Sequence, residues 1–250
     1  MKNRAYKNYI FDFYGTLVDI LTDEKDPVLW DKLGQLYQAY GAAYEGETLK
    51  KAYAKHVDQA RKELIDLKGV AYPEIDLAHI FNQLYVDARP QSSNSNQPED
   101  WGQLIAMVFR VLSRKHVTAY PHTKEVLAFL KEQGCRIYLL SNAQAAFTNA
   151  EIDLMELRPY FDAIYLSSDV GICKPQPEFL KQVLDDYGLK PSETVMVGND
   201  LTTDIAVAEA VGIDGILLNT FPYSRRELEN SPIKPDRVIT DIEALKTNFT

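Results

Sequence analysis

A carboxylate directly after an apolar run is the first feature of this sequence that could do chemistry. The run from Tyr9 to Phe11 predicts a buried strand, which ends at Asp12 and leads into a Gly15-Thr16 turn. In an open α/β sheet, reactive groups collect just beyond the carboxyl ends of the strands. A carboxylate in that place can attack phosphorus or carbon and form a covalent intermediate. Asp12 is therefore a candidate nucleophile, although in isolation such a short string more often marks a carboxylate that only closes a strand.

Three further groups of polar residues follow predicted strands later in the chain. They are Ser141 with Asn142, then Lys174, and then Asn199, Asp200 and Asp204. Because ligands of open parallel sheets bind outside the carboxyl ends of the strands, we expect these groups to converge with Asp12 on one site.

The converging residues suit the transfer of a group that carries charged oxygens. Ser141 and Thr16, together with nearby backbone amides, can hold these oxygens. Asn142, next to Ser141, is a further candidate for binding the substrate. Lys174 can neutralise charge on both the nucleophile and the substrate. The oxygens of Asp12 and Asp204 suit Mg²⁺, which prefers carboxylates, carbonyls and water.

The elements that must position these residues are alternating strands and helices. From about residue 118 onward we predict strands at 136–140, 163–167, 194–197, 215–218 and 237–239, with helices between them. Such alternation predicts an α/β fold, with a parallel sheet covered by helices on both faces.

A block of helical periodicity separates the first strand from this region. We predict helices at 27–43, at 48–67, from residue 73 onward and at 98–115, with a polar loop at 91–100. The block therefore predicts an all-helical insert, 19–117, that lies like a lid over the strand ends of a core formed by 1–18 and 118–250.

Composition limits the classes of partner. The 250 residues carry 27 basic and 36 acidic side chains, a net charge of −9, which argues against general binding to nucleic acid or to an anionic membrane. Two cysteines cannot form the disulfide framework of a secreted domain. The first apolar run is too short for a signal peptide, and no apolar segment of 18 residues exists, so we predict a cytoplasmic protein. An anionic substrate would be held by a few local cations or by backbone amides.

The four strand-end segments resemble the four motifs of the haloacid dehalogenase-like hydrolase superfamily. They read FDFYGTLVD, LLSNA, GICKPQPEF and VGNDLTTDI, in order between residue 9 and about residue 220. The resemblance implies a Rossmann-like core with an α-helical cap inserted after the first motif. It also implies that Asp12 is the nucleophile, that Ser141 and Lys174 bind the transferring group, and that the segment 199–204 serves a metal ion.

Two positions depart from the phosphatases of that superfamily. Most of them have a second Asp two residues after the nucleophile, which protonates the leaving group and then activates water, whereas this chain has Tyr14. A phenol with a pKa of about 10 donates a hydrogen bond but is a poor base at neutral pH. Tyr14 either takes part in catalysis or packs against the cap while its carbonyl reaches the metal. The second departure is Asn199 before Asp200, which leaves open which of the two is the ligand.

The departures keep three functions open. We favour a Mg²⁺-dependent phosphatase of a small phosphorylated metabolite, because the fourth motif is acidic. With Tyr14 two residues after Asp12, the first motif is similar to that of L-2-haloacid dehalogenases. In those enzymes the leaving group is a halide, which needs neither a proton nor a metal ion to depart. Those enzymes clamp the substrate carboxylate with a cap arginine after a Trp, where this chain has Trp30-Asp31-Lys32. The third alternative is a protein that binds a phosphorylated ligand with little turnover.

Substrate choice is expected to come from the helical cap. Its candidate residues form a basic stripe, which a solvated helix face would also explain: Lys51, Lys55, His56, Arg61 and Lys62. The sequence identifies neither the physiological substrate nor the oligomeric state.

Overall fold

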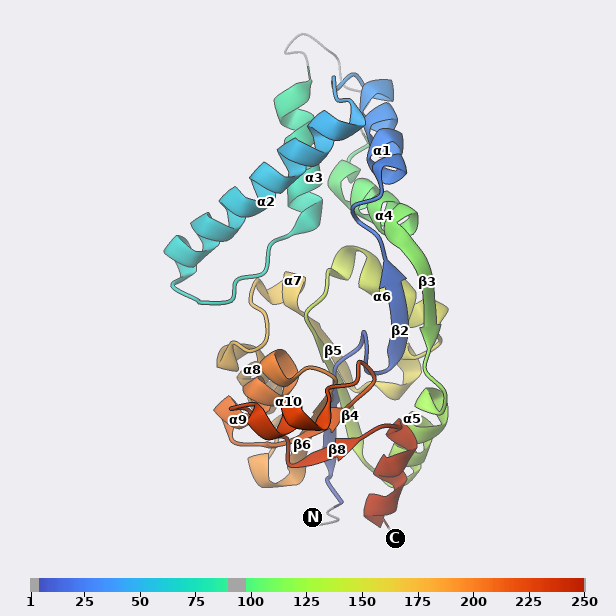
Figure 1. Cartoon of the computed structure of the whole chain (residues 1–250), viewed down its shortest axis with the longest axis vertical. Helices are drawn as coiled ribbons and strands as arrows, with labels where there is room; N and C mark the ends of the chain where they lie inside the picture. Colours follow the sequence, from blue (N-terminus) through green and yellow to red (C-terminus); the bar gives the residue numbers. More distant parts are fainter. Residues whose placement is uncertain (1–4, 90–97, 250) are drawn as a thin grey trace.

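The computed structural model describes residues 5–89 and 98–249, which form a sheet-based part below and a helical part above (Figure 1). Most of the polar loop expected at 91–100 lies outside these residues. Within the described ranges, no helix is long and apolar enough to cross a membrane.

A six-stranded parallel sheet organises the lower part. Its order is β5 (Ala163–Leu166), β4 (Arg136–Ser141), β1 (Asn8–Phe11), β6 (Thr194–Gly198), β7 (Asp214–Leu218) and β8 (Arg237–Ile239). Central strand β1 pairs in parallel with β4 on one side and β6 on the other. The residues that follow β1, β4 and β6 therefore meet at the same edge, as the strand alternation predicted.

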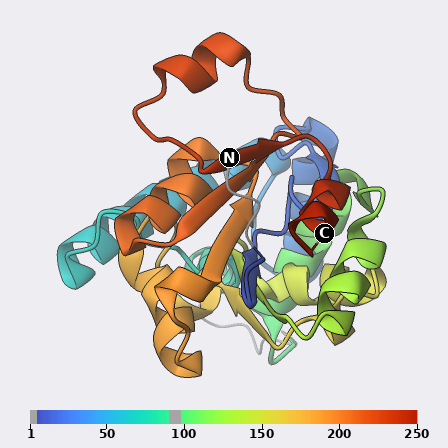
Figure 2. The same cartoon turned by 90° about the horizontal axis from the view of Figure 1, so that it is seen from below.

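Helices cover both faces of this sheet, because successive side chains of a strand point to opposite sides. Tyr9 and Phe11 of β1 pack in one core with α5 (Thr123–Glu132) and α6 (Ala145–Leu154), whereas Ile10 packs in another with α8 (Pro177–Tyr187) and α9 (Ala206–Val211). Figure 2 shows the two groups of helices on opposite sides of the sheet. The sequence prediction of an α/β Rossmann-like core is confirmed.

The helical part consists of α1 (Pro27–Ala39), α2 (Gly46–Lys68), α3 (Leu77–Ala88) and α4 (Trp101–Ser113). They enclose a separate core that is rich in aromatic rings, including Tyr37, Phe81, Tyr85, Trp101 and Phe109. Asp26 and Asp76 cap α1 and α3 by accepting hydrogen bonds from backbone amides of the first turn.

Two strands that the sequence did not predict join the helical part to the sheet. β2 (Val18–Thr22) and β3 (Arg114–Ala119) pair antiparallel, and both run between the two parts (Figure 1). β3 reads RKHVTA and is mostly polar and partly exposed, so it lacks a hydrophobic period. The ribbon forms by backbone pairing between segments that lie about a hundred residues apart in the chain. The local pattern of apolar residues therefore does not reveal it.

Several predicted helix limits were wrong. The helix expected from residue 73 begins at Leu77, because residues 72–74 instead bond the backbone of 171–173 in the loop before Lys174. The first cap helix ends at Ala39 rather than 43, and Gly41 follows with a φ of 89°. The last cap helix ends at Ser113, where β3 begins. The helix expected between the strands predicted at 194–197 and 215–218 begins as a π-helical turn, Leu201–Ile205.

Beyond β7 the chain forms a short helix that was not predicted, α10 (Arg225–Asn230). A 3₁₀ segment, Ile242–Phe249, follows β8. The segment between β7 and α10 lies at the carboxyl end of the sheet, beside the candidate site described next.

Candidate active site

Asp12, Ser141 and Lys174 come together at the carboxyl ends of β1 and β4. The Ser141 hydroxyl donates to Oδ1 of Asp12 over 3.0 Å, and the Lys174 ammonium donates to the same oxygen over 2.7 Å. The Thr16 hydroxyl lies 3.3 Å from the other carboxylate oxygen, Oδ2. Three side chains therefore fix the orientation of the Asp12 carboxylate, which is nearly buried.

Lys174 is buried between two carboxylates. Its Nζ atom donates to Oδ1 of Asp12, to Oδ1 of Asp204 and to the backbone carbonyl of Leu140, each over 2.7 Å. Burial alone would lower the pKa of Lys174, but the charges of Asp12 and Asp204 outweigh it and raise the pKa above its usual range. The side chain is therefore a fixed positive charge whose three N–H groups are all used.

Asn142 holds the Lys174 loop in place. Its amide nitrogen donates to the Lys174 carbonyl over 2.9 Å, and its amide oxygen accepts from the Lys174 backbone N–H over 2.7 Å. Asn142, which was predicted to bind substrate, therefore uses these two hydrogen bonds to hold Lys174 in position.

The segment after β6 forms the other wall of the site. Asp204 is buried, which raises the pKa of its carboxyl group, and its Oδ2 accepts from the backbone N–H of Asp200 over 3.0 Å. Gly198 allows this approach, because a Cβ atom there would lie 2.3 Å from the Asp204 carboxyl group. The Asp200 carboxylate accepts from the backbone amides of Thr202 and Thr203 and caps the following turn. The positions of the Asp200 and Asp204 carboxylates therefore both depend on this one tight turn.

The donors around Asp12 fit a hard cation. Asn199 Oδ1 and Asp12 Oδ2 both lie within 3.3 Å of the Thr16 hydroxyl, which places an amide oxygen and a carboxylate oxygen on the same side. Oxygen donors of this kind suit Mg²⁺. Among the described residues, no group of three or more His, Cys, Asp or Glu side chains is arranged to hold a metal. A bound Mg²⁺ would therefore take much of its coordination from water, carbonyl, amide and substrate oxygens.

Tyr14 also faces this site, and its phenol is hydrogen-bonded to residues of helix α6. The phenolic oxygen lies 2.5 Å from Oε2 of Glu151 and 3.1 Å from the Thr148 hydroxyl. Because a carboxylate can only accept, the phenol donates to Glu151, and Thr148 is left to donate to the phenolic oxygen. Burial raises the pKa of Tyr14 above its usual value.

Glu151 is the centre of a buried ionic cluster that the sequence analysis missed. Arg110 binds it through two hydrogen bonds of 2.8 and 3.0 Å, and Arg114 adds one of 2.9 Å. The Arg110 guanidinium also lies over the rings of Tyr14 and Phe147, at 5.0 and 4.6 Å from their centroids. The one available signal was Arg110 itself, the single charged residue in the otherwise apolar helix WGQLIAMVFRVLS.

The loop after β7 also reaches the site and was not predicted to do so. The Thr220 hydroxyl donates to the Gly15 carbonyl, which ties this loop to the turn after Asp12. Gly15 has a φ of 80°, and a Cβ atom there would lie 2.6 Å from Nδ2 of Asn199 and 2.9 Å from the Phe221 ring. Only glycine therefore fits the turn at Gly15.

The site is a cavity of about 200 Å³ whose walls carry all the strand-end residues except Thr16. Thr16 is buried and contacts the Asp12 carboxylate. Its lining consists of Asp12, Tyr14, Ser141, Asn142, Lys174, Asn199, Asp200, Thr203 and Asp204. The proposed basic stripe does not line this cavity. Lys51, Lys55, Arg61 and Lys62 are exposed, and His56 pairs with Asp87 over 2.9 Å.

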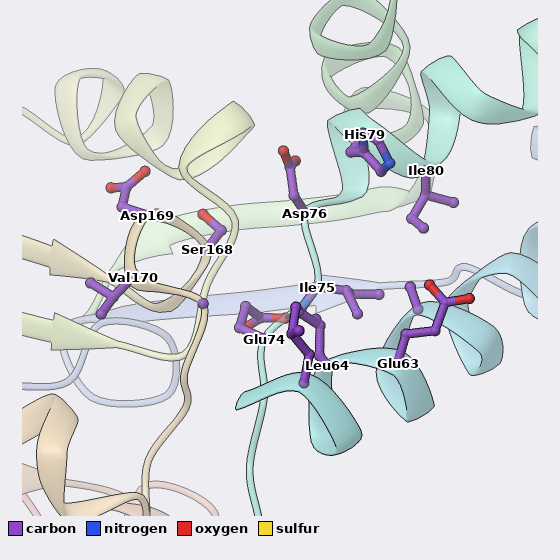
Figure 3. A pocket seen from close by; sticks show the side chains of 13 residues that line it. Glu63, Leu64, Glu74, Ile75, Asp76, His79, Ile80, Ser168, Asp169 and Val170 are labelled. Atoms are coloured by element: carbon purple, nitrogen blue, oxygen red, sulfur yellow. Dashed lines mark hydrogen bonds between the residues drawn. The ribbon is translucent and has the colours of Figure 1, made fainter. Parts of the chain in front are cut away.

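A larger cavity of about 450 Å³ lies between α2 and α3 on one side and α7 (Ser167–Val170) on the other (Figure 3). Its polar lining is mainly acidic, with Glu63, Glu74, Asp76 and Asp169 around it. It contains none of the residues that converge on Asp12, so the smaller cavity is the candidate active site.

A parallel sheet with a fixed carboxylate, hydroxyl and ammonium at its strand ends, beneath an inserted helical part, defines a Rossmann-like hydrolase. The family model of haloacid dehalogenase-like hydrolases matches residues 6–212, and the chain belongs to this family.

Relatives of two activities resemble this chain. It is 31% identical over 130 residues to the ribulose-1,5-bisphosphate 5-phosphatase of Halopiger xanaduensis, an alignment that covers 52% of each chain. In fold it resembles a HAD phosphatase of Thermococcus onnurineus, with a TM-score of 0.62, 18% identity and 97% of both chains covered. It also resembles the 2-haloacid dehalogenase of Pseudomonas syringae, with a TM-score of 0.67, 19% identity and 98% of both chains covered. The chain spans about half the length of the first curated relatives it matches.

Proposed function

We propose that this protein is a Mg²⁺-dependent phosphatase that acts on a small phosphorylated metabolite through an aspartyl phosphate on Asp12. The observation that carries the proposal is the placement of the Lys174 ammonium between two carboxylates, 2.7 Å from Asp12 and 2.7 Å from Asp204. This arrangement places positive charge beside a carboxylate nucleophile, which suits a phosphoryl group with its own negative charge.

The reaction proceeds in two displacements at phosphorus. An Asp12 carboxylate oxygen attacks phosphorus, the bond from phosphorus to the leaving oxygen breaks, and Asp12 carries the phosphoryl group. Water then attacks the same phosphorus, which releases inorganic phosphate and restores the carboxylate. Ser141 and Lys174 orient Asp12 and offset charge in both steps. Asp12, Asn199 and the neighbouring oxygen donors would hold Mg²⁺, which would supply further charge neutralisation.

The helical part suits the role of a cap. The domain division that we propose is a catalytic core of 1–18 and 118–250 and a cap of 19–117. The two separate apolar cores and the β2–β3 ribbon between them support this division. The relative from Halopiger xanaduensis is named a phosphatase, which supports the activity. The net charge of −9 favours a small anionic substrate over nucleic acid.

Dehalogenation of a 2-haloacid is the second candidate, and Tyr14 two residues after Asp12 is the observation that favours it. The charge around the site opposes it. The stretch Trp30-Asp31-Lys32 supplies no arginine, and the guanidinium of Arg110 is already bound to Glu151 through two hydrogen bonds. A guanidinium engaged in this way is not free to clamp a substrate carboxylate.

The test is hydrolysis of p-nitrophenyl phosphate with Mg²⁺ and with EDTA, by the natural protein and by Asp12→Asn. Asp153→Asn is the matched control, because Asp153 pairs with Arg158 on the exposed side of α6. We expect Mg²⁺-dependent release of nitrophenol that Asp12→Asn abolishes and Asp153→Asn leaves unchanged. Halide release from 2-chloropropionate in the absence of phosphatase activity would overturn the proposal in favour of dehalogenation.

A further inference from the structure

Among the described residues, the cavity around Asp12 presents no acidic side chain that is free to protonate a departing group. Its phenol and its ammonium are already engaged with other protein atoms, and this feature limits which phosphorylated compounds the site can cleave. A positioned acid contributes typically 10²–10⁴-fold to rates of reactions that need one.

The Tyr14 hydroxyl is already bonded to residues of helix α6. Its hydroxyl directs its single proton toward Glu151 over 2.5 Å, on the side of helix α6. The oxygen also has the Thr148 hydroxyl at 3.1 Å, so both sides of the phenolic O–H are occupied. To protonate a leaving group, Tyr14 would first have to give up a charge-assisted hydrogen bond, the stronger kind.

Glu151 is itself held too firmly to follow Tyr14 toward the substrate. Two arginines from the cap side, Arg110 and Arg114, bind its two oxygens, and only 2% of the residue is exposed. Arg110 is 8% exposed and stacks on the Tyr14 ring. Breaking a buried charged pair of this kind is strongly unfavourable, because it leaves an uncompensated charge inside the protein. The cluster therefore fixes the phenol in one direction.

The other strong donors in the cavity are committed as well, and the carboxylates of Asp200 and Asp204 accept hydrogen bonds from backbone amides. The Asn199 amide and the Thr203 hydroxyl also line the cavity, but an amide and an alcohol are too weakly acidic to serve as the general acid. Lys174 gives its three N–H groups to Asp12, Asp204 and the Leu140 carbonyl. Ser141 donates to Asp12. The Asn142 amide donates to the Lys174 carbonyl.

We propose that this site cleaves phosphoryl groups from leaving groups that depart as stable anions, namely acyl phosphates, phosphoanhydrides and aryl phosphates, in preference to alkyl phosphate esters. This inference rests on the proposed phosphatase function and narrows its substrate class. In the first step the bond between phosphorus and the leaving oxygen breaks, and the electron pair stays on that oxygen as a carboxylate, phosphate or phenolate. An alkyl ester would leave as an alkoxide, which needs a proton from an acidic group, and the phenol and ammonium that line this cavity are both engaged elsewhere.

The experiment is a series of phenyl phosphates of nearly constant shape, with para-nitro, para-chloro, unsubstituted and para-methoxy rings, followed by acetyl phosphate and glycerol 1-phosphate. The quantity to plot is log(kcat/KM) against the pKa of the leaving group, since kcat/KM reports the first irreversible step. For the natural protein we expect a steep fall with leaving-group pKa, and acetyl phosphate at least about 100-fold faster than glycerol 1-phosphate, the smaller end of an acid's contribution.

Tyr14→Asp supplies a carboxyl group in place of the phenol, and it should flatten the slope and raise the rate with glycerol 1-phosphate. Tyr14→Phe should leave the slope as steep as in the natural protein, because the phenol is not the proton donor. Asp153→Asn, on the exposed side of the same helix, should leave the whole plot unchanged. Mass spectrometry of the rapidly quenched enzyme with acetyl phosphate should show one added phosphoryl group, lost in Asp12→Asn.

The outcomes separate this inference from the function on which it rests. A shallow slope for the natural protein, or a slope that Tyr14→Phe alone makes steeper, would overturn the inference and leave the phosphatase intact. Failure to cleave any compound of the series and to form the phosphorylated enzyme would overturn the phosphatase proposal itself.

Discussion

The ammonium nitrogen of Lys174 lies 2.7 Å from Oδ1 of Asp12, although the two residues come from loops 162 positions apart in the chain. Only 1% of the Lys174 side chain and 10% of the Asp12 side chain are exposed. Such a pair is held by its surroundings, and it fixes the orientation of the strand-end carboxylate that we propose as the nucleophile.

Replacement of this ammonium should cost both stability and activity. Lys174→Met would leave Asp12 and Asp204 facing each other without a cation. Removing one partner of a buried ion pair costs roughly 3–5 kcal/mol, and we expect the free energy of unfolding in urea to fall by about that amount. Lys131→Met is the control, because the Lys131–Asp162 pair is partly exposed and should change stability by less than about 1 kcal/mol. Equal losses in the two variants would contradict the buried pair.

Asn142 is expected to act on turnover rather than on substrate affinity. Asn142→Ala removes both hydrogen bonds that hold the Lys174 backbone. A displacement of about 1 Å at a reacting group can cost 10²-fold, so we expect kcat for p-nitrophenyl phosphate to fall by roughly that factor with KM changed little. If KM rises while kcat stays constant, Asn142 binds the substrate directly, the role predicted for it from the sequence.

Glu151→Gln should reveal the buried cluster through the pH dependence of stability. Burial alone would raise the pKa of Glu151, but hydrogen bonds from Arg110 and Tyr14 outweigh it and hold the pKa below its usual value. A carboxyl group with a lower pKa in the folded state contributes stability that is complete above the unfolded pKa of about 4.3. That contribution is lost as the pH falls through the folded pKa.

We therefore expect Glu151→Gln to lower the free energy of unfolding at pH 7 by roughly 3 kcal/mol, and the difference to shrink in acid. Urea unfolding between pH 3 and pH 8, in steps of about one unit, measures it across this range. Asp153→Asn on the same helix should show little difference, because solvent screens its pair with Arg158. A difference that stays constant down to the acid end would show that the Glu151 charge does not stabilise the fold.

Gly198 should tolerate no side chain. Its Cβ would overlap the Asp204 carboxyl group at 2.3 Å, so Gly198→Ala must displace Asp204 or the strand end. We expect a loss of about 1–3 kcal/mol in stability, the usual cost of overpacking, together with a marked loss of activity. Gly215→Ala in the adjacent strand is the matched control, because its nearest neighbour, a side-chain carbon of Ile205, would lie at 3.3 Å and can adjust. Retention of full activity by Gly198→Ala would argue against a role for Asp204 at the site.

The sequence by itself determined where along the chain the strands that carry chemistry lie, and which residues stand at their ends. An apolar run that stops at Asp12, and a similar run before Ser141, are local patterns, and parallel sheets bring such ends to one edge. The meeting of Asp12, Ser141 and Lys174 therefore followed from the alternation of strands and helices. The helical block between the first strand and the rest was equally visible, because its helices carry a period of 3.6 residues.

Only the tertiary structure decided what Tyr14 does. Its partner Glu151 is 137 positions away, and Arg110 reaches that carboxylate from a helix of the other part. The β2–β3 ribbon and the Thr220 contact with Gly15 depend in the same way on segments that are distant in the chain. Such contacts form where the two apolar cores dock and leave polar groups to be satisfied, and no local period or turn signal records them. Sequence therefore specified the strand-end carboxylate, and packing specified the environment around it.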